Sequence, residues 1–584
     1  MKKTIALALG IVCACLSFAQ QKISGRLVDA INHLPVENAT IKIGEQSTLS
    51  NSKGEFIIDC NNDAELHVTC SGFEPFHQKF SCNQQLYITL IPTFKQMETV
   101  EVTANSNHLS SQLDQSRSIV KLREMELKRG TGLFLDDAIS TNVPGVIMER
   151  RSHSGGQQLN IRGYGNGIGI RGINSNFDIQ GTKFYLNGIP LTDAEGITIL
   201  DDIDFSSLGN VEISKGPSGT IYGFAIAGVV NFQMQKPEKS GTTVGQDVII
   251  GSDGLLRTTT RIGLHNSKSS LLVNYGHQEY DGFMPHTASH KNFANLFTEF
   301  SVSDRQNISA YLGFADSYDE RNGELTIQQY ENFDYSGNPN YIKNNAHSAV
   351  RTFRAGVTNR YTFLRGFSNT TTVFGTGQNM DNSSAGGWTD KTPLNYGFRS
   401  TFDNQFHLSK KISLSGITGI EMQKMHAQIA GYAMGADSTN LSGYNTITTT
   451  RSNQLASSFS SSYFTEWTLH LPYGFKVSGG VGISNMKLSL EDRLWAINNN
   501  RPGNEKLRVF EESYRNLVAP SFAVHKKIGE SFAVYVSHSS GFKAPVTSNI
   551  LISTTGQVNT GLKPEKGSQI EVGAKGNLVD GRLF

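Results

Sequence analysis

Long apolar runs are nearly absent from this sequence, and their absence excludes a helical membrane protein. Past residue 19 no apolar stretch reaches the roughly eighteen residues of a membrane-spanning helix, so a chain that spans a membrane must do so with strands. The apolar run at the start, Thr4 to Phe18, follows Lys2 and Lys3 and is followed by Ala19. This pattern is typical of a secretory signal peptide, which we assign to residues 1–19.

Cysteine is also scarce, with five residues in the chain. Two lie in the predicted signal peptide, and Cys60, Cys70 and Cys82 lie in one early segment. Export to an oxidising compartment permits one disulfide among these three and leaves one thiol, and the sequence does not decide the pairing. No CxxC spacing occurs, which argues against a structural zinc site.

An excess of charge of either sign is missing too, because 52 Lys and Arg residues balance 51 Asp and Glu residues. A net charge this small gives no reason to expect nucleic acid as a partner. No Ser-His-Asp order, paired-carboxylate motif or phosphate loop emerges, so neither an enzyme nor a cofactor is predicted. His286 and His290 have the spacing of metal ligands on a helix, but they fall in a predicted loop and no metal site is assigned.

Residues 20–92 alternate short β-rich runs with turn residues such as Asn51-Ser52-Lys53-Gly54, which predicts a small β-sandwich. The segment resembles the carboxypeptidase-regulatory-like domain in its opening from Gly25 to Asp29 and in the motif Ser71 to Glu74. His67 and His77 have no carboxylate partner in a motif, so we expect a structural adaptor and not a catalytic domain.

Glycine punctuates the next region, residues 133–237, which contains the runs NIRGYGNGIGIRG, FYLNGIPLTDAEG and VEISKGPSGTIYGFAIAGVVNF. Helical spacing predicts a helix from Leu133 to Thr141, and Asn187-Gly188 predicts a hairpin turn. Five β-rich runs predict a small mixed sheet: Val146 to Glu149, Leu159 to Arg162, Lys183 to Leu186, Val211 to Ser214 and Val229 to Met234. Gly167 to Gly172 matches G-x-G-x-x-G, but the residues that follow cannot begin a helix, so dinucleotide binding is not predicted.

These runs resemble the plug domain of TonB-dependent receptors, which we place at residues 111–238. The residues that match the motifs of the family are Arg162, Gly163, Asn187, Gly188, Pro190, Glu212, Gly216, Pro217, Tyr222, Gly223, Gly228 and Asn231. Three positions depart from it: Lys215 replaces the usual Arg, Asn187 the usual Asp, and Ala227 the first of two glycines. The resemblance implies a compact α/β plug inside a barrel.

Residues 239–584 offer alternating strands of about ten residues, the length of a tilted membrane strand. Tight polar turns recur between them, and longer polar stretches, among them Asn379 to Pro393, predict loops on the opposite rim. The pattern contains about fourteen strands and the start of a fifteenth at Arg582, whereas the barrel of the family has 22. We therefore expect the chain to be a truncated or partial barrel.

Residues 93–110 connect the adaptor to the plug and resemble the TonB box and linker of the same family. Such an extended strand can add itself to the edge of a partner sheet. The residues assigned to binding TonB are Glu98, Thr99, Val100, Glu101, Val102, Thr103 and Ala104. The resemblance implies TonB, acting with ExbB and ExbD, as the partner.

The resemblance as a whole implies a mainly β protein: an N-terminal β-sandwich, an α/β plug domain and an antiparallel transmembrane β-barrel among outer-membrane lipids. The β-sandwich and the TonB box would lie in the periplasm. Residues 323–333, GELTIQQYENF, look similar to the ferric-complex branch, so the expected function is import of a ferric siderophore or another iron complex. The alternatives are import of cobalamin, another metal complex or an oligosaccharide, or a surface receptor that binds without transport. The sequence does not identify the ligand or the loop residues that contact it.

Overall fold

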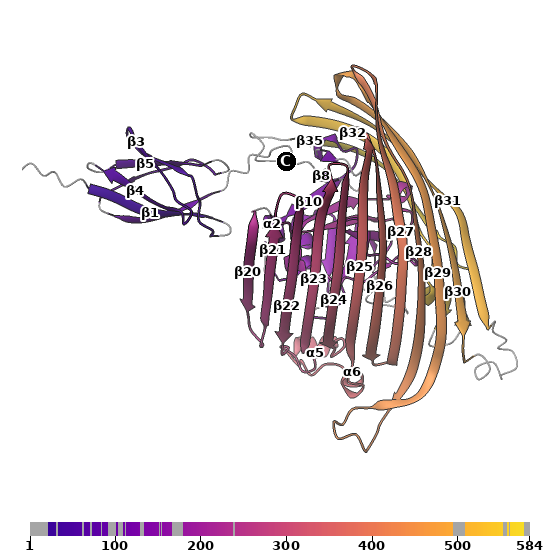
Figure 1. Cartoon of the computed structure of the whole chain (residues 1–584). Coiled ribbons are helices and arrows are strands. Elements are labelled where there is room, and N and C mark those ends of the chain that lie inside the picture. Colours follow the sequence, from indigo (N-terminus) through magenta and orange to yellow (C-terminus); the bar gives the residue numbers. More distant parts are fainter. Residues whose placement is uncertain are drawn as a thin grey trace, which may run out of the picture. The chain divides into compact units, whose positions relative to one another are not determined.

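The structure of the chain is a computed structural model (Figure 1). It describes residues 21–30, 33–60, 64–70, 73–82, 84–91, 101–102, 109–110, 112–128, 133–150, 152–153, 155–165, 179–237, 240–494, 508–552, 557–559 and 561–576. The contacts divide the chain into two compact units, Met1–Thr99 with Asn577–Phe584, and Val100–Gly576. The predicted signal peptide and the start of the predicted fifteenth strand lie outside the described residues.

The described part of the first unit is a seven-stranded β-sandwich, as predicted. Its strands are β1 (Gln21–Asp29), β2 (Thr40–Ile43), β3 (Gln46–Leu49), β4 (Glu55–Cys60), β5 (Ala64–Thr69), β6 (Phe76–Phe80) and β7 (Gln85–Leu90). One sheet has the order β4-β1-β7 and the other the order β3-β2-β5-β6. Ile23 and Phe56 from the first sheet pack with Ile41 and Leu66 from the second, so alternate residues of both sheets form the core.

The cysteines of this sandwich are in two states. Cys60, at the end of β4, forms a disulfide with Cys82, and the bridge closes a loop across 22 positions of the sequence. Cys70 remains a thiol. The structure thus selects one of the pairings that the sequence left open.

The plug occupies the first part of the second unit and is built around a mixed five-stranded sheet. The order is β10-β18-β19-β15-β16, in which β15 and β19 run parallel and the other neighbours antiparallel. These strands are β10 (Ile119–Arg123), β15 (Thr182–Leu186), β16 (Ile189–Pro190), β18 (Leu208–Lys215) and β19 (Gly228–Met234). All five residues of β15 are buried, because both faces of this central strand are covered.

Smaller elements complete the plug. They are η1 (Gln112–Asp114), α2 (Glu124–Leu127), α3 (Leu135–Asn142), β11 (Val146–Glu149), β12 (Gln158–Ile161), β13 (Tyr164–Gly165), β14 (Ile179–Gln180), β17 (Ile197–Thr198), η2 (Phe205–Ser207) and α4 (Gly219–Tyr222). The predicted helix is α3, and the predicted turn at Asn187-Gly188 joins β15 to β16 with φ of 48° and 80°. One prediction was wrong: β11 and β12 pair with each other in a separate sheet of the order β11-β12-β13 and do not extend the mixed one.

The described residues that follow the plug form a sheet of fourteen antiparallel strands. They are β20 (Gly241–Ile250), β21 (Leu256–His265), β22 (Ser269–Tyr280), β23 (Ser289–Ser303), β24 (Gln306–Glu320), β25 (His347–Leu364), β26 (Phe367–Ser384), β27 (Gly387–Ser409), β28 (Ile412–Gly435), β29 (Thr446–Leu471), β30 (Phe475–Asp492), β31 (Val509–Ile528), β32 (Phe532–Lys543) and β35 (Glu565–Gly576). Each strand pairs with the next, and the count agrees with the fourteen strands expected.

Two details of the predicted barrel were wrong. The strands have 10 to 26 residues and not a uniform length near ten, so the longest reach well beyond the span of a bilayer. The polar stretch Asn379 to Pro393 is not a loop, because β26 and β27 run through it and only residues 385–386 separate them. Strand ends outside the apolar band carry polar residues and therefore look like loops in a sequence.

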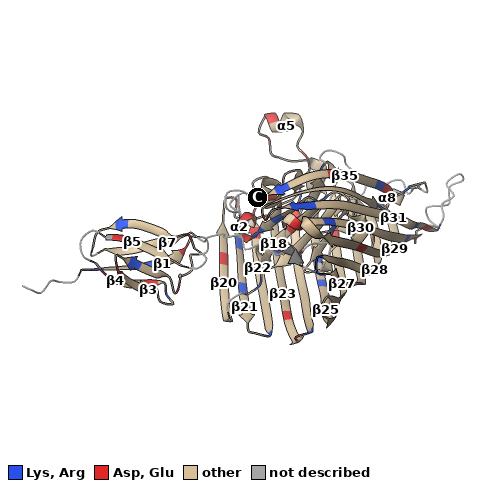
Figure 2. Ribbon diagram, turned by 90° about the horizontal axis from the view of Figure 1, so that it is seen from above, with Lys and Arg blue, Asp and Glu red and all other residues tan. Residues whose placement is uncertain are grey.

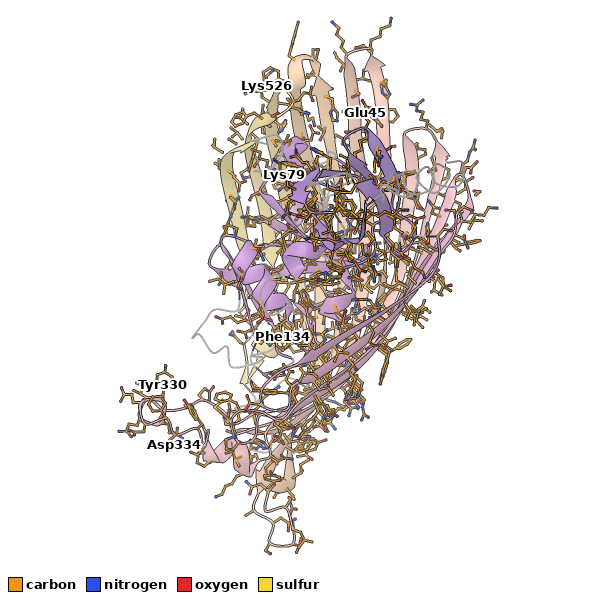
Figure 3. The ribbon with its side chains drawn as sticks, turned by 90° about the vertical axis from the view of Figure 1, so that its left-hand side faces the viewer. Glu45, Lys79, Phe134, Tyr330, Asp334 and Lys526 are labelled. Carbon is orange, nitrogen blue, oxygen red and sulfur yellow. A yellow bond between two sulfur atoms is a disulfide. The ribbon has the colours of Figure 1, made fainter. Side chains whose placement is uncertain are left out.

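The two rims of the sheet differ. One rim has short turns, among them η3 (Pro472–Gly474), and the other has longer connections that carry α5 (Ile327–Glu331), α6 (Pro339–Lys343), α8 (Thr547–Ile550), β33 (Leu551–Ile552) and β34 (Gln557–Val558). In Figure 3, Tyr330 and Asp334 project from the long-loop rim, whereas Lys526 lies at the short-turn rim. This asymmetry is the expected arrangement of an outer-membrane barrel.

The sheet curves around the plug (Figure 1). Its inner face contributes Leu272, Phe297, Tyr311 and Phe374 to the same apolar core as the plug strands. Its outer face exposes large apolar side chains on alternate residues, for example Ile570 and Val572 on β35. Seen from above, most of the length of the strands carries neither acidic nor basic residues (Figure 2).

Candidate functional site

A cavity of about 1130 Å³ lies between the plug and the long-loop rim of the sheet. The plug lines it with residues from 136–153 and with Glu195 and Ile197, and the sheet lines it with the rim ends of β22, β24 and β26 to β30. Its volume exceeds the upper end, about 1,000 Å³, of the usual range for small-molecule sites. The cavity can therefore hold a large organic or metal-complex ligand.

The lining of this outer cavity combines aromatic, amide and charged side chains. Two of the aromatic side chains that line the cavity, Trp388 and Tyr432, come from the rim ends of β27 and β28. Tyr330 lies on α5 and is 72 % exposed. Amide groups come from Asn382 and Gln454. Side chains of this kind fix the orientation of a ligand by hydrogen bonds and stack on its planar parts.

Glu195 of the plug is a buried carboxyl group at the edge of this cavity. Its Oε2 accepts hydrogen bonds from the hydroxyl and the backbone N–H of Thr547, at 3.1 and 3.4 Å. Its Oε1 has no protein partner among the described residues. Burial, and secondarily the neighbouring Asp193 carboxylate, raises the pKa of Glu195 to about 7. One oxygen of Glu195 is thus available to a group in the cavity.

A stacked cluster lies on the plug side of the same cavity. The ring of His153 stacks on Tyr280 of the sheet at a centroid distance of 3.7 Å. The guanidinium of Arg150 lies 3.4 Å from the centre of the Phe134 ring and donates to Asp136 at 2.7 Å. Burial, with Arg150 as a second cause, lowers the pKa of His153 to about 4, so this ring is neutral at physiological pH.

A second cavity, of about 350 Å³, lies at the opposite end of the plug, next to the short-turn rim. The plug lines it with residues 114–117 and with Lys215, Pro217 and Ser218, and strands β27 to β32 and β35 supply the remaining walls. The plug therefore separates two cavities that open toward opposite rims of the sheet.

Buried polar groups hold the plug against the sheet at mid-height. Glu421 of β28 accepts from Lys183 and Gln423 with Oε1, at 3.0 and 2.9 Å. Its Oε2 accepts from Tyr185 and Arg399, each at 2.9 Å. All four acceptor positions of the carboxylate are thus occupied, as a buried charge requires.

The acidic turn of the plug at residues 201–204 makes a second set of contacts. Asp202 binds Arg354 of β25 in a bidentate pair, at 2.8 and 3.2 Å. Asp204 pairs with Arg257 of β21, which also donates to the carbonyl oxygen of Leu133 at 2.6 Å. Bidentate guanidinium–carboxylate pairs fix position as well as charge, so the turn is anchored to two separate strands.

The predicted motif residues shape turns and contacts of the plug. Arg162 forms an ion pair with Glu571 of β35 at 2.7 Å, and Gly163 follows it in the turn before β13. Asn187 Oδ1 accepts from the backbone N–H of Met234, which ties the turn at Asn187-Gly188 to β19. Pro190 lies opposite Tyr185 in the hairpin.

The remaining motif residues lie on or beside β18, α4 and β19. Glu212 pairs with Lys121 at 3.1 Å and lies opposite Asn231 in the β18–β19 ladder. Tyr222 packs edge-on against Tyr185. Three glycines allow close approach to the sheet or to another strand, Gly216, Gly223 and Gly228, and Pro217 lines the smaller cavity. The motif therefore forms one structural unit, and its role in transport stays a prediction.

Of the predicted TonB-box residues, Glu101 and Val102 are described. They form β8 (Glu101–Val102), which pairs antiparallel with β9 (Leu109–Ser110). The others lie outside the described residues: Glu98, Thr99, Val100, Thr103 and Ala104.

No group of three or more His, Cys, Asp or Glu side chains in the described part of the chain is arranged to hold a metal ion. His286 contacts Glu320 at 3.7 Å and the carbonyl oxygen of Ala346, and His290 stacks on Tyr318. The helices within the described ranges are too short or too polar to cross a membrane.

Sequence reasoning missed the side chains that join plug to sheet, above all Glu421 and Arg354. The partners of Glu421 lie up to 238 positions away, so no local motif marks them. Local patterning gives no usable signal, because β28 carries polar residues on both faces, Glu421 and Gln423 on the inner one and Lys424 on the outer one.

Two family models match this chain. The TonB-dependent Receptor Plug Domain matches residues 111–229, and the TonB dependent receptor-like, beta-barrel family matches residues 263–584, more than half of the chain. The chain therefore belongs to the TonB-dependent receptor family. This is a family of outer-membrane receptors and transporters, not of enzymes.

Curated relatives match part of the chain. The vitamin B12 transporter BtuB of Vibrio vulnificus (strain CMCP6) is 29% identical over 291 residues, which is 47% of this chain and 45% of the relative. The pesticin receptor of Yersinia enterocolitica is 28% identical over 147 residues, 24% of this chain and 19% of the receptor. The matched regions thus span less than half the length of these relatives.

Solved structures share the fold. The ferric citrate transporter FecA superposes with a TM-score of 0.65 at 13% identity, over 80% of this chain and 68% of that one. The siderophore receptor PiuA from Acinetobacter baumannii gives 0.64 at 13% identity, over 83% and 73%. At such identity the likeness is one of fold alone.

Proposed function

We propose that this protein imports a scarce ligand across the outer membrane, and that the ligand is a ferric siderophore or another iron complex. The observation that carries this is a plug that separates an outer cavity of about 1130 Å³ from a smaller cavity at the opposite rim. A plug in this position blocks the path through the sheet until it moves. The solved relatives FecA and PiuA, a ferric citrate transporter and a siderophore receptor, support iron as the cargo.

In the proposed orientation, the long-loop rim faces the medium, and the β-sandwich and the TonB box face the periplasm. Ligand binds the outer cavity, where aromatic and amide groups and the free oxygen of Glu195 contact it. Binding favours a state with an accessible box, which requires a higher affinity for that state. TonB pairs with residues 98–104 and, with ExbB and ExbD, transmits energy from the inner membrane.

Growth on defined iron sources tests the proposed cargo. A strain that lacks the gene is compared with the complemented strain on ferric citrate, a ferric hydroxamate and a ferric catecholate, each as the sole iron source. The proposal expects at least one complex to support growth only in the presence of the gene. Equal growth of both strains on all three, with equal uptake, contradicts it.

Cobalamin is a second candidate cargo, because the vitamin B12 transporter of V. vulnificus is 29% identical over 291 residues. Cobalamin-dependent growth of the same two strains distinguishes the candidates. Gene-dependent growth on cobalamin, with iron acquisition unchanged, favours cobalamin over iron.

A further inference from the structure

The turn of the plug that carries Glu195 is fixed at the outer cavity, the cavity of about 1130 Å³ at the long-loop rim. Asp193 Oδ1 accepts hydrogen bonds from the backbone N–H groups of Glu195 and Ile197, each at 2.9 Å. The backbone N–H of Ala194 donates to Oδ1 of Asn395 on β27 at 3.1 Å. Both the turn itself and the sheet therefore hold Glu195 in place.

The carboxyl group of Glu195 has partners on one oxygen only. The residue is 3 % exposed, and both hydrogen bonds from Thr547 of α8 go to Oε2. Oε1 is buried and has no partner among the described residues. A buried carboxylate is stable when donors reach both of its oxygens. The folded chain thus leaves a place for one further donor at Oε1.

The raised pKa of Glu195 agrees with a shortage of donors. Burial raises this pKa to about 7 and the Asp193 carboxylate adds to the rise, whereas Lys391 and the hydrogen bonds from Thr547 oppose it without offsetting it. An N–H group of a ligand at Oε1 would stabilise the charged form. Binding of such a ligand and ionisation of Glu195 therefore favour each other.

A second polar atom of the plug lacks a partner at the same cavity. Nε2 of His153 is buried and has no hydrogen-bond partner among the described residues. The ring stacks on Tyr280, and its lowered pKa of about 4 keeps it neutral. A neutral imidazole forms hydrogen bonds without supplying a positive charge. The plug thus offers a ligand two hydrogen-bonding atoms, and neither is cationic.

The described residues that line the outer cavity give it a slightly acidic balance of charge. Five of them are acidic: Asp136, Glu149, Glu195, Glu320 and Glu324. Four are basic: Arg150, Arg321, Lys391 and Arg451. A cavity that attracts a ligand with several negative charges needs an excess of positive charge. This lining has no such excess.

Carboxylates already compensate two of the cations. Arg150 donates from Nε to Asp136 at 2.7 Å and from Nη1 to the carbonyl oxygen of His153 at 3.0 Å. Lys391 lies close enough to Glu195 to act on the pKa of that carboxyl group, so its charge faces an acidic side chain. A compensated cation attracts an anionic ligand less than an isolated one does.

Iron complexes differ in the two properties that this cavity distinguishes. Three hydroxamate groups neutralise a ferric ion, whereas three catecholate groups leave the complex with several negative charges, and ferric citrate is anionic as well. A trishydroxamate whose chelating groups are joined by amide links also presents N–H donors. Planar groups of any of these ligands can stack on Trp388 and Tyr432. Charge and N–H donors are therefore the basis of selection, and stacking is not.

We propose that Glu195 selects the ligand by its charge. The outer cavity binds a metal complex that has no net negative charge and that donates an N–H group to Oε1 of Glu195. Among iron complexes this is a ferric trishydroxamate with amide links, and ferric catecholates and ferric citrate are discriminated against. The assignment rests on the proposed function, because it takes the outer cavity as the binding site of the imported ligand.

Affinities for three classes of iron complex test the selection by charge. The full chain is purified in detergent, and equilibrium dialysis with radioactive iron measures its affinity for a linear ferric trishydroxamate with amide links, a ferric catecholate and ferric citrate. The measurements are made at pH 8, above the pKa of Glu195. Wild type is expected to bind the hydroxamate at least about tenfold more tightly than either anionic complex, the effect of one charge-assisted hydrogen bond. Equal or tighter binding of an anionic complex overturns the selection, although iron remains the cargo.

Glu195→Gln tests the role of this carboxylate through the ratio of the hydroxamate affinity to the catecholate affinity. The variant loses the charge-assisted contact with the hydroxamate and the repulsion of the catecholate, so the ratio is expected to fall by about tenfold or more. A purely structural role would weaken both affinities alike. An unchanged or larger ratio therefore overturns the role of Glu195.

Glu530→Gln is the matched control. It removes the same charge from a side chain that is 92 % exposed, in the turn between β31 and β32 and outside the cavity lining, so it is expected to leave the ratio unchanged. The comparison of the three complexes in wild type remains decisive if Glu195→Gln does not fold.

Cobalamin separates failure of this inference from failure of the proposed function. It carries amide groups and no net negative charge, so it belongs to the selected class. Wild type that binds cobalamin and none of the iron complexes contradicts iron as the cargo, and weaker cobalamin binding in Glu195→Gln then supports the selection. Cobalamin binding that Glu195→Gln leaves unchanged in that case, or binding of none of the four ligands, contradicts both.

Discussion

Lys183 of plug strand β15 and Glu421 of barrel strand β28 form an ion pair in which both side chains are at most 5 % exposed. Arg399 adds a second cation to the same carboxylate, and its guanidinium lies 4.6 Å from the centre of the Phe464 ring. Two positive charges thus share one negative charge away from water. Plug docking depends on this single carboxylate more than on either cation.

Glu421→Gln is expected to weaken plug docking more than Lys183→Met. The first change leaves two buried cations without their counter-charge, a loss of about 3–5 kcal/mol for a broken buried pair. The second leaves Glu421 paired with Arg399. Chemical unfolding of the purified variants measures the loss of unfolding free energy that each substitution causes. An equal or larger loss in Lys183→Met than in Glu421→Gln contradicts this order.

Asp202→Asn should destabilise the protein far more than Asp316→Asn, although both remove the partner of an arginine on β25. Asp202 pairs with Arg354, which is enclosed, whereas Asp316 pairs with Arg351, whose side chain is 66 % exposed. The expected losses are about 3 kcal/mol or more for the buried pair and less than about 1 kcal/mol for the exposed one. Similar unfolding curves for the two variants would disprove the role of burial.

Gly482→Ala tests how closely plug and sheet approach. A Cβ at Gly482 of β30 would lie 2.2 Å from the carbonyl oxygen of Thr220 in α4, whereas a Cβ at Gly479 of the same strand meets nothing within 4 Å. Overpacking of this kind costs about 1–3 kcal/mol, so Gly482→Ala should loosen the plug and Gly479→Ala should not. Limited proteolysis of the plug compares them, and identical digestion rates refute the close fit.

The raised pKa of Glu195 predicts a pH dependence of stability. Its folded-state pKa of about 7 lies above the ordinary value of 4.5, so the unfolded carboxyl ionises first as pH rises. Stability attributable to this group is therefore full below pH 4.5, falls between pH 4.5 and 7, and levels off above. Glu195→Gln should remove this fall, as measured by the difference in unfolding free energy from wild type. Parallel curves of unfolding free energy against pH for wild type and Glu195→Gln would contradict the predicted pH dependence.

Local chemistry made part of the fold predictable. Asn187-Gly188 specifies its own turn, because both residues adopt positive φ at little cost, and α3 followed from helical spacing. The plug strands followed from β-rich runs between glycines. The tight turn between β26 and β27 was missed, because polar residues on strand ends beyond the bilayer carry the signal of a loop.

The contacts that define the site were not predictable from the sequence. Lys575 reaches a carbonyl oxygen 463 positions earlier, and Lys183 reaches Glu421 across 238 positions. The residues next to a single lysine on a strand do not indicate which backbone carbonyl oxygens will accept its hydrogen bonds. Such pairs follow from the register of fourteen strands around the plug, which no single segment encodes.

Iron uptake by cells that carry the chain without residues 98–104 tests energy-coupled import most directly. Surface binding and internalisation of radioactive iron from the three ferric complexes are measured in parallel with wild type. The account predicts unchanged surface binding and uptake reduced to that of cells without the gene. Uptake at the wild-type rate would contradict coupling through the TonB box.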